Sequence, residues 1–205
     1  MTNRPSSERV AAYQYLQSPR LAEWVEQAGL NNLGPGKRQS TPCEQLGRLE
    51  LAELLAPRPI VQKEFARSIL AGLLLLYDGL EESHTISQSL NNPTGSYWHG
   101  IMHRREPDPG NAKYWFDRVG PHPIHPLLCQ RALPLFQAAS QGQTPPQLRE
   151  LAMGTAWLAA KFVDLCQYAE RHQHSSLIMI CQQAQRLEME LLLDYCYRQA
   201  MGLPD

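Results

Sequence analysis

The sequence predicts an all-α protein, a single-domain helical bundle of about seven to nine helices around one central apolar helix at about residues 60–80. Three observations support this fold class. Apolar residues recur at helical spacing along most of the chain, residues typical of helix N-caps precede several of these stretches, and the Val-, Ile- and Thr-rich alternation of β-strands is absent. Because 205 residues can bury a substantial core, we expect residues 7–205 to form one helical domain and residues 1–6 a flexible tail.

Capping residues predict where several helices begin. Ser18 precedes a proline, which is typical of an N-cap followed by the first helical position. Thr41 also precedes a proline, Glu44 completes a capping box behind it, and Thr144 opens a third such signature. The helices expected from these signals and from the apolar spacing cover about residues 7–16, 19–28, 42–55, 60–80, 96–106, 112–119, 127–139, 148–172 and 177–201.

The central helix is predicted by five apolar residues at helical spacing: Phe65, Ile69, Leu73, Leu76 and Leu80. Most of the residues beside them are apolar as well, and a helix that is apolar on most faces is buried. Asp78, Glu81 and Glu82 are predicted to lie at its C-terminal end. Acidic residues there oppose the helix dipole at a cost of a few tenths of a kcal/mol, which indicates that a partner compensates them.

Composition limits the classes of partner. The formal net charge is −1, from 19 basic and 20 acidic side chains, so no global field attracts nucleic acid or an anionic membrane. The longest apolar run, residues 69–77, is too short to cross a bilayer, and the first residues do not resemble a secretory signal. The five cysteines include no Cys-x-x-Cys pair, so we expect reduced thiols in a cytoplasmic protein.

The segment from Asp78 to His125 has a different character from the rest of the chain. It contains five of the seven histidines and two of the four tryptophans, interleaved with arginines and carboxylates. An exposed surface would have the charges without the tryptophans, and an apolar core would have the reverse. The mixture therefore favours a partly buried polar site.

A metal site is the first interpretation of this segment. At about 100° per residue, His99, His103 and Glu106 fall on one face of a helix that covers about residues 96–106. Two imidazoles and one carboxylate form a ligand set that proteins use for catalytic zinc and for non-haem iron. A fourth ligand would come from the preceding element, from Asp78, Glu82 or His84. In the alternative interpretation the two histidines are structural and hydrogen-bonded.

An anion-binding site is a second interpretation. Arg104, Arg105 and Lys113 carry the charges that hold a carboxylate or phosphate, and Trp98 would lie beside them in the substrate-binding site. Asn111 can cap the next helix, whose N-terminus would also favour an anion. In the alternative interpretation the arginines belong to an internal salt-bridge set with the neighbouring acids.

Together these residues predict a small helical enzyme, a metal-assisted hydrolase or proton-transfer enzyme that acts on a small polar or anionic molecule. Asp78, Glu82 or His84 would donate or accept the proton. Two alternatives stay open: a non-enzymatic module that binds an anionic or sugar-like small molecule, and an internal polar network. In the second case the function lies elsewhere, for instance in assembly into a homo-oligomer.

Part of the chain resembles the signature block of a family of uncharacterised bacterial proteins. The residues that carry the resemblance are PTGSYWHGIMHRREPD at 93–108, NAKYWF at 111–116 and ESHTISQ at 82–88. The likeness covers roughly a quarter of the chain. It implies no activity, cofactor or catalytic residue.

Overall fold

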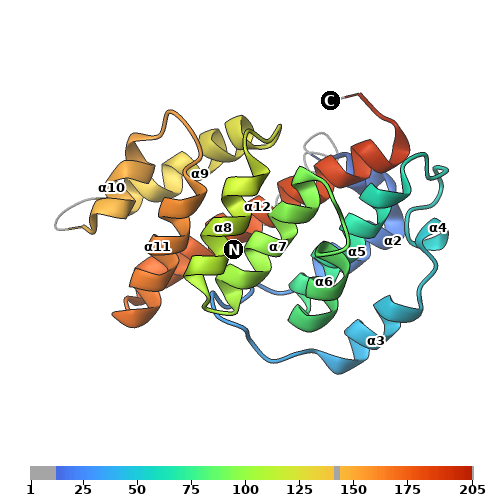
Figure 1. The fold of residues 1–205 in the computed structure, drawn as a ribbon, viewed down its shortest axis with the longest axis horizontal. Helices are drawn as coiled ribbons and strands as arrows, with labels where there is room; N and C mark the ends of the chain where they lie inside the picture. The colour runs from blue at the N-terminus through green and yellow to red at the C-terminus, as the bar shows by residue number, and fades with distance from the viewer. Residues whose placement is uncertain (1–12, 141–143, 205) are drawn as a thin grey trace.

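Eleven α-helices and one short 3-10 helix make up the regular structure of residues 13–140 and 144–204, the residues that the computed structural model describes. No strand occurs among these residues, which confirms the all-α, single-domain fold class (Figure 1). The elements are η1 (Gln14–Gln17), α2 (Pro19–Gln27), α3 (Ser40–Arg48), α4 (Leu51–Leu54), α5 (Lys63–Leu76), α6 (Leu80–Ser87), α7 (Pro93–Arg105), α8 (Pro109–Val119), α9 (His125–Ala139), α10 (Pro146–Met153), α11 (Ala159–Arg171) and α12 (Ser175–Met201).

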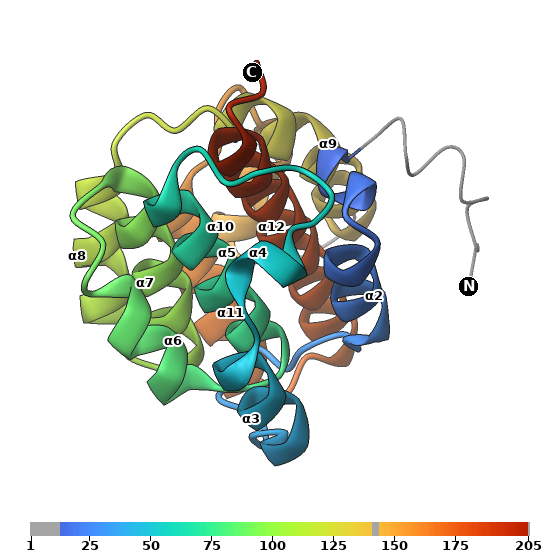
Figure 2. The same cartoon turned by 90° about the vertical axis from the view of Figure 1, so that its right-hand side faces the viewer.

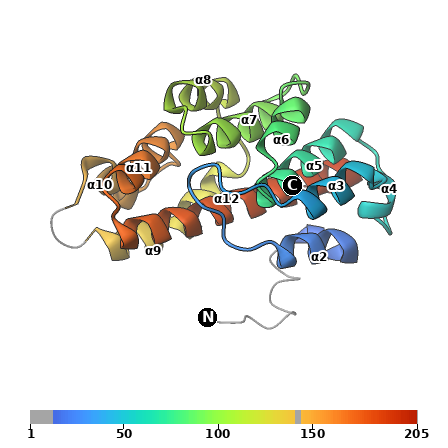
Figure 3. The same ribbon diagram turned by 90° about the horizontal axis from the view of Figure 1, so that it is seen from below.

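The 27-residue helix α12 runs along the long axis of the molecule, from one end of the bundle to the other. It packs against α5, α9, α11 and η1. Seen from below, α7 and α8 lie on one side of α12 and α2 lies on the opposite side (Figure 3). The view along the molecule shows the same arrangement, with α6, α7 and α8 grouped away from α2 (Figure 2).

Helix α7 is the most completely enclosed helix of the bundle. Twelve of its thirteen residues are buried, and it packs against α5, α6 and α8. The predicted central apolar helix corresponds to α5, in which nine of fourteen residues are buried. Two helices therefore occupy the centre of the fold. The apolar composition of α5 predicts its burial, whereas the polar composition of α7 does not.

Close contact between α5 and α7 depends on Gly72. A Cβ atom at this position would lie 2.6 Å from ring carbons of Trp98 and 2.9 Å from a methyl carbon of Leu193. Trp98 is fully buried, so its indole has no free space to move into. The absence of a side chain at Gly72 thus lets the Trp98 ring lie against the backbone of α5.

The central helix ends earlier than predicted. Helix α5 stops at Leu76 because Asp78 adopts a left-handed conformation, with φ of 60°, and the Gly79 N–H donates back to the Leu74 carbonyl. A new helix, α6, then starts at Leu80. Glu81 and Glu82 lie in its first turn, where the helix dipole stabilises acidic residues, so the expected unfavourable placement at a C-terminus was wrong.

The structure also differs from the predicted helix list in its number of elements and in three caps, the first of which is Thr144, because α10 starts at Pro146 after Pro145. The predicted helix at 148–172 is two helices, because the chain leaves α10 at Gly154 and buries Trp157 against Phe136 and Phe162 before α11 begins. Helix α3 starts at Ser40, before Thr41, and Asp108 rather than Asn111 caps α8. Ser18 caps α2 as expected. The predicted tail, residues 1–6, lies outside the described residues.

Within the described part of the chain, no helix combines the length and the apolar character needed to cross a bilayer. The cysteines at positions 43, 129, 166, 181 and 196 are all free thiols. This agrees with the expectation that they form no disulfide framework.

We predict that Gly72→Ala lowers the free energy of unfolding by about 1–3 kcal/mol, because the added methyl group must displace the Trp98 ring or the α5 backbone. Urea denaturation measures the change. Gly47→Ala is the matched control, since nothing lies within 4 Å of a Cβ there and the residue is exposed on α3. That variant should be neutral or more stable by up to about 1 kcal/mol. Equal effects at the two positions would contradict the packing argument.

Candidate metal centre

Helix α7 places its two histidines on one face. Asn92 caps the helix by accepting a hydrogen bond from the Gly95 N–H at 2.8 Å, and Pro93 occupies the first turn. The helix then continues without interruption to Arg105. His99 and His103 are one turn apart, as the sequence predicted, and both are buried.

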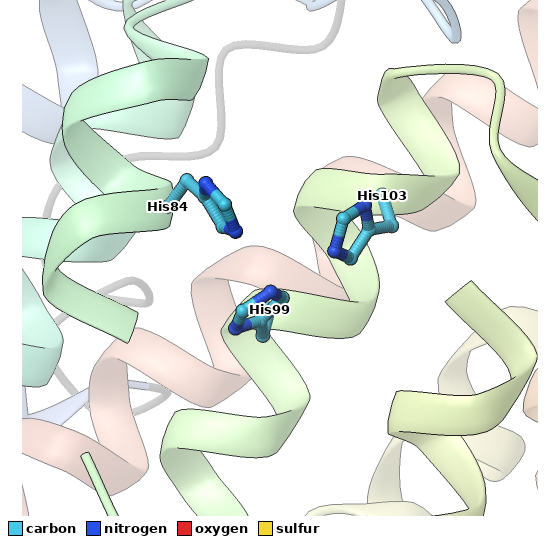
Figure 4. A group of neighbouring side chains, drawn as sticks. All are labelled: His84, His99 and His103. Atoms are coloured by element: carbon cyan, nitrogen blue, oxygen red, sulfur yellow. The ribbon is translucent and has the colours of Figure 1, made fainter. Parts of the chain in front are cut away.

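A third histidine reaches the same place from α6. The potential ligand atoms of His84, His99 and His103 all lie within 4.8 Å of one another. The ring centroids are 4.7 Å apart for His84 and His99, 5.5 Å for His84 and His103, and 4.7 Å for His99 and His103. The three rings converge on the space between α6 and α7 (Figure 4). This group could hold a metal ion.

His99 is poised as a neutral ligand. Burial, with smaller contributions from the neighbouring His103 and His84, lowers its pKa to about 4. The ring is therefore neutral near pH 7 and keeps a lone pair that a metal can accept. Its Nδ1 is buried without a hydrogen-bond partner in the described part of the chain. Such an atom is costly unless a ligand or ion satisfies it.

Trp115 of α8 holds the His99 ring from one side. The two ring centroids are 4.0 Å apart and the planes differ by 17°. Stacking restricts rotation of the imidazole, and restricted ligands lose less entropy when they bind a metal. The sequence placed Trp98 beside the charged residues, but Trp98 is 0% exposed and packs on Gly72. Trp115 is the tryptophan that contacts the histidines.

Glu106 acts on His103 and lies outside the three-histidine group. Its Oε2 is 3.0 Å from Nδ1 of His103, and its side chain is 44% exposed. An ionised carboxylate can only accept, so Nδ1 carries the proton and Nε2 keeps the lone pair. Carboxylates often orient metal-binding histidines in this way. The predicted set of His99, His103 and Glu106 is therefore corrected: His84 supplies the third potential ligand, and Glu106 fixes the tautomer of the second.

Arg105 and Asp78 form a buried structural pair. The Arg105 guanidinium is completely buried and donates to the Asp78 carboxylate, to the Leu75 carbonyl at 2.6 Å and to the Gly34 carbonyl at 3.3 Å. Asn31 also donates to Asp78, at 3.1 Å. Arg105 thus ties the end of α5 to α7. It has no exposed surface for a substrate, and Asp78 is engaged as its counter-ion.

Arg104 pairs with a carboxylate on α12. Its Nη2 donates to Glu188 Oε2 at 2.6 Å, and the Tyr97 hydroxyl donates to the other oxygen of Glu188 at 3.1 Å. The guanidinium also lies 4.6 Å from the ring centre of Phe162. Burial alone would lower the pKa of Arg104, but the Glu188 charge outweighs it and the net shift is upward. Arg104 is therefore an internal cation rather than a surface anion binder.

The other predicted site residues lie apart from the histidines. Glu82 forms an ion pair with Arg38, and Lys113 forms one with Asp164 on α11. Burial raises the pKa of Glu82, but hydrogen bonds from Arg38 and from the backbone outweigh it, so the net shift is downward. A carboxylate with a lowered pKa and an arginine partner is a poor proton donor near neutrality.

Sequence reasoning missed Glu188, Asn31 and Arg38, which neutralise or hold the polar residues of the segment. No local signal identifies them, because each lies in another part of the chain. Fold and site together define an all-α protein with a candidate three-histidine metal centre. The chain matches no model of a known protein family, no curated protein and no solved structure in the comparisons.

We predict that Glu188→Gln lowers the free energy of unfolding by about 3–5 kcal/mol, because it leaves the buried Arg104 charge uncompensated. Glu150→Gln is the matched control, since its ion pair with Lys161 is about half exposed. It should change stability by no more than about 1 kcal/mol. Chemical denaturation compares them. If Glu188→Gln lowered the free energy of unfolding as little as Glu150→Gln does, the buried ion pair would not be essential to the fold.

Proposed function

We propose that this protein binds a divalent transition-metal ion, Zn²⁺ or Fe²⁺, through His84, His99 and His103, and uses it to hydrolyse a small polar molecule or to move a proton on one. The observation that carries the proposal is the convergence of three imidazoles from two helices, one of them with a buried nitrogen that has no partner among the residues that the structure describes. Ordinary core histidines have hydrogen-bond partners.

The donor set suits these ions. Imidazole nitrogen is a common ligand of zinc and of iron, whereas magnesium and calcium prefer oxygen. Three protein ligands are typical of catalytic zinc sites, which keep a further position for water or substrate. His84 is partly exposed while the other two rings are buried, so we infer that the open position faces the His84 side.

The expected chemistry follows from that open position. A bound metal lowers the pKa of a coordinated water to about 7 and polarises a substrate carbonyl or phosphoryl oxygen. The oxygen of that water would bond to the electrophilic carbon or phosphorus, the bond to the leaving group would break, and the leaving group would take up the proton that the water gave up. The Glu106–His103 hydrogen bond would hold the ligand geometry through this change.

The proton carrier differs from the one that the sequence suggested. Asp78 and Glu82 are engaged by Arg105 and Arg38. Glu106 contacts the site through His103 and has no arginine partner in the described residues, and its side chain is partly exposed. We therefore assign proton exchange with solvent to Glu106.

We predict that chelator-treated protein takes up about one Zn²⁺ per chain, and that His84→Ala, His99→Ala and His103→Ala each weaken the affinity at least tenfold. Elemental analysis after dialysis measures the stoichiometry, and competition with a chromophoric chelator measures the affinity. Hydrolysis of a panel of ester, amide and phosphoester substrates should appear only after the chelator-treated protein has been reloaded with Zn²⁺.

His174→Ala is the control, because His174 is exposed and lies outside the three-histidine group. Far-ultraviolet circular dichroism establishes that each variant is folded. A wild-type protein that takes up no metal would overturn the proposal. Metal uptake without turnover on any substrate would favour the non-enzymatic alternative, in which the ion holds a ligand.

A further inference from the structure

A surface hollow lies next to the three-histidine group, where the end of α6, the start of α7 and the second half of α8 meet. Its volume is about 240 Å³, and its polar and aromatic lining includes Gln88, Asn91, Asn92, Ser96, Trp115 and Arg118. The hollow is distinct from the charged residues that the sequence suggested for anion binding. Those residues, Arg104, Arg105 and Lys113, are all paired with carboxylates.

Arg118 supplies the positive charge of the hollow. Its guanidinium carbon lies 5.4 Å from the ring centre of Trp115 and 5.8 Å from that of Tyr114. No ion pair of Arg118 with a carboxylate occurs among the described residues. An arginine stacked on aromatic rings is held in place while its N–H groups remain available to an oxyanion.

Ser96 supplies a hydroxyl in the wall of the hollow. The residue is 8% exposed, and its side chain forms no hydrogen bond within the part of the chain that the structure describes. The hydroxyl oxygen is not among the fully enclosed polar atoms without a partner, so it is open to the hollow, where a ligand or water can complete its hydrogen bonding. This observation is independent of the charge on Arg118.

The first turn of α7 forms another part of the wall, and the positive end of its dipole adds to the attraction for an anion. Asn92 caps the helix, and its amide nitrogen donates to the Glu64 carboxylate at 3.2 Å. Glu64 is therefore engaged by Asn92 and is absent from the lining of the hollow.

Trp115 links the hollow to the candidate metal centre. It lines the hollow and also stacks on the His99 ring at 4.0 Å. A molecule seated on Arg118 and Ser96 would therefore lie close to the three histidines, separated from His99 by the Trp115 side chain.

We propose that this hollow is an oxyanion-binding subsite, in which Arg118 and Ser96 hold a carboxylate or phosphate group of the substrate. As a statement about the substrate this rests on the proposed function, but anion binding itself does not require the metal. The shared chemistry is a compact group with two or more acceptor oxygens, which fits guanidinium and hydroxyl donors.

The test is a titration of metal-free, chelator-treated protein with inorganic phosphate and, separately, with acetate at constant ionic strength. The observed signal is the indole N–H resonance of Trp115, assigned by its loss in Trp115→Phe. We expect a saturable shift with at least one anion, and at least tenfold weaker binding in Arg118→Gln. Ser96→Ala should weaken binding severalfold. A response to phosphate alone identifies a phosphate ester, and a response to acetate alone identifies a carboxylate.

Arg149→Gln is the matched control, because Arg149 is an exposed arginine on α10 and is absent from the lining of the hollow. It should bind like the wild type. The absence of a saturable shift with either anion, or equal weakening by both arginine variants, would overturn the subsite. Zinc uptake of Arg118→Gln, measured in parallel, should equal that of the wild type. A chain that binds phosphate but takes up no metal would overturn the proposed function alone.

Discussion

Helix α7 is buried along almost its whole length although it carries two arginines and two histidines, and the surrounding structure is organised to compensate them. An unpaired buried charge costs several kcal/mol, so each guanidinium must have a counter-ion from another element. Glu188 on α12 serves Arg104, and Asp78 after α5 serves Arg105. The left-handed turn at Asp78 and the long C-terminal helix are therefore parts of one arrangement, because both bring carboxylates to α7.

The need for counter-ions separates the polar residues of α7 into two groups, the arginines and the histidines. The charges of both arginines are paired with carboxylates inside the protein, and these ion pairs tie α7 to α5 and α12, although Arg104 Nε and Nη1 and Arg105 Nε have no hydrogen-bond partner in the described residues. The histidine face has no such counter-ions from other elements: His103 is oriented by Glu106, while a buried nitrogen of His99 has no partner, both within the described part of the chain. With His84 added from α6, the polar group that remains on this face could hold a metal ion. Arg118 on α8 is a cation without a carboxylate partner in the described residues, next to Trp115 on the same side.

Features that depend on short stretches of chain could be predicted from the sequence. Helical spacing predicted the all-α class, and it placed His99 and His103 one turn apart, since the period of a helix fixes that relation. Features that depend on long-range packing could not be predicted. Glu188 lies 84 residues from Arg104, and no local pattern joins them. The sequence around Trp98 and Trp115 does not distinguish which of the two is buried. The close approach of α7 to Gly72 of α5 buries Trp98, and this contact is a long-range one. Asp78 follows the end of α5, where the sequence placed it, but its pairing with Arg105 depends on a residue distant along the chain.

X-ray absorption spectroscopy of the zinc-loaded protein tests whether His84, His99 and His103 form one metal centre. The structure predicts about three imidazole nitrogens at about 2.0–2.1 Å, with an oxygen completing a tetrahedral shell, and one imidazole fewer in His84→Ala. A first shell that contains sulfur at about 2.3 Å, or an imidazole number unaffected by His84→Ala, would place the metal elsewhere and contradict the account.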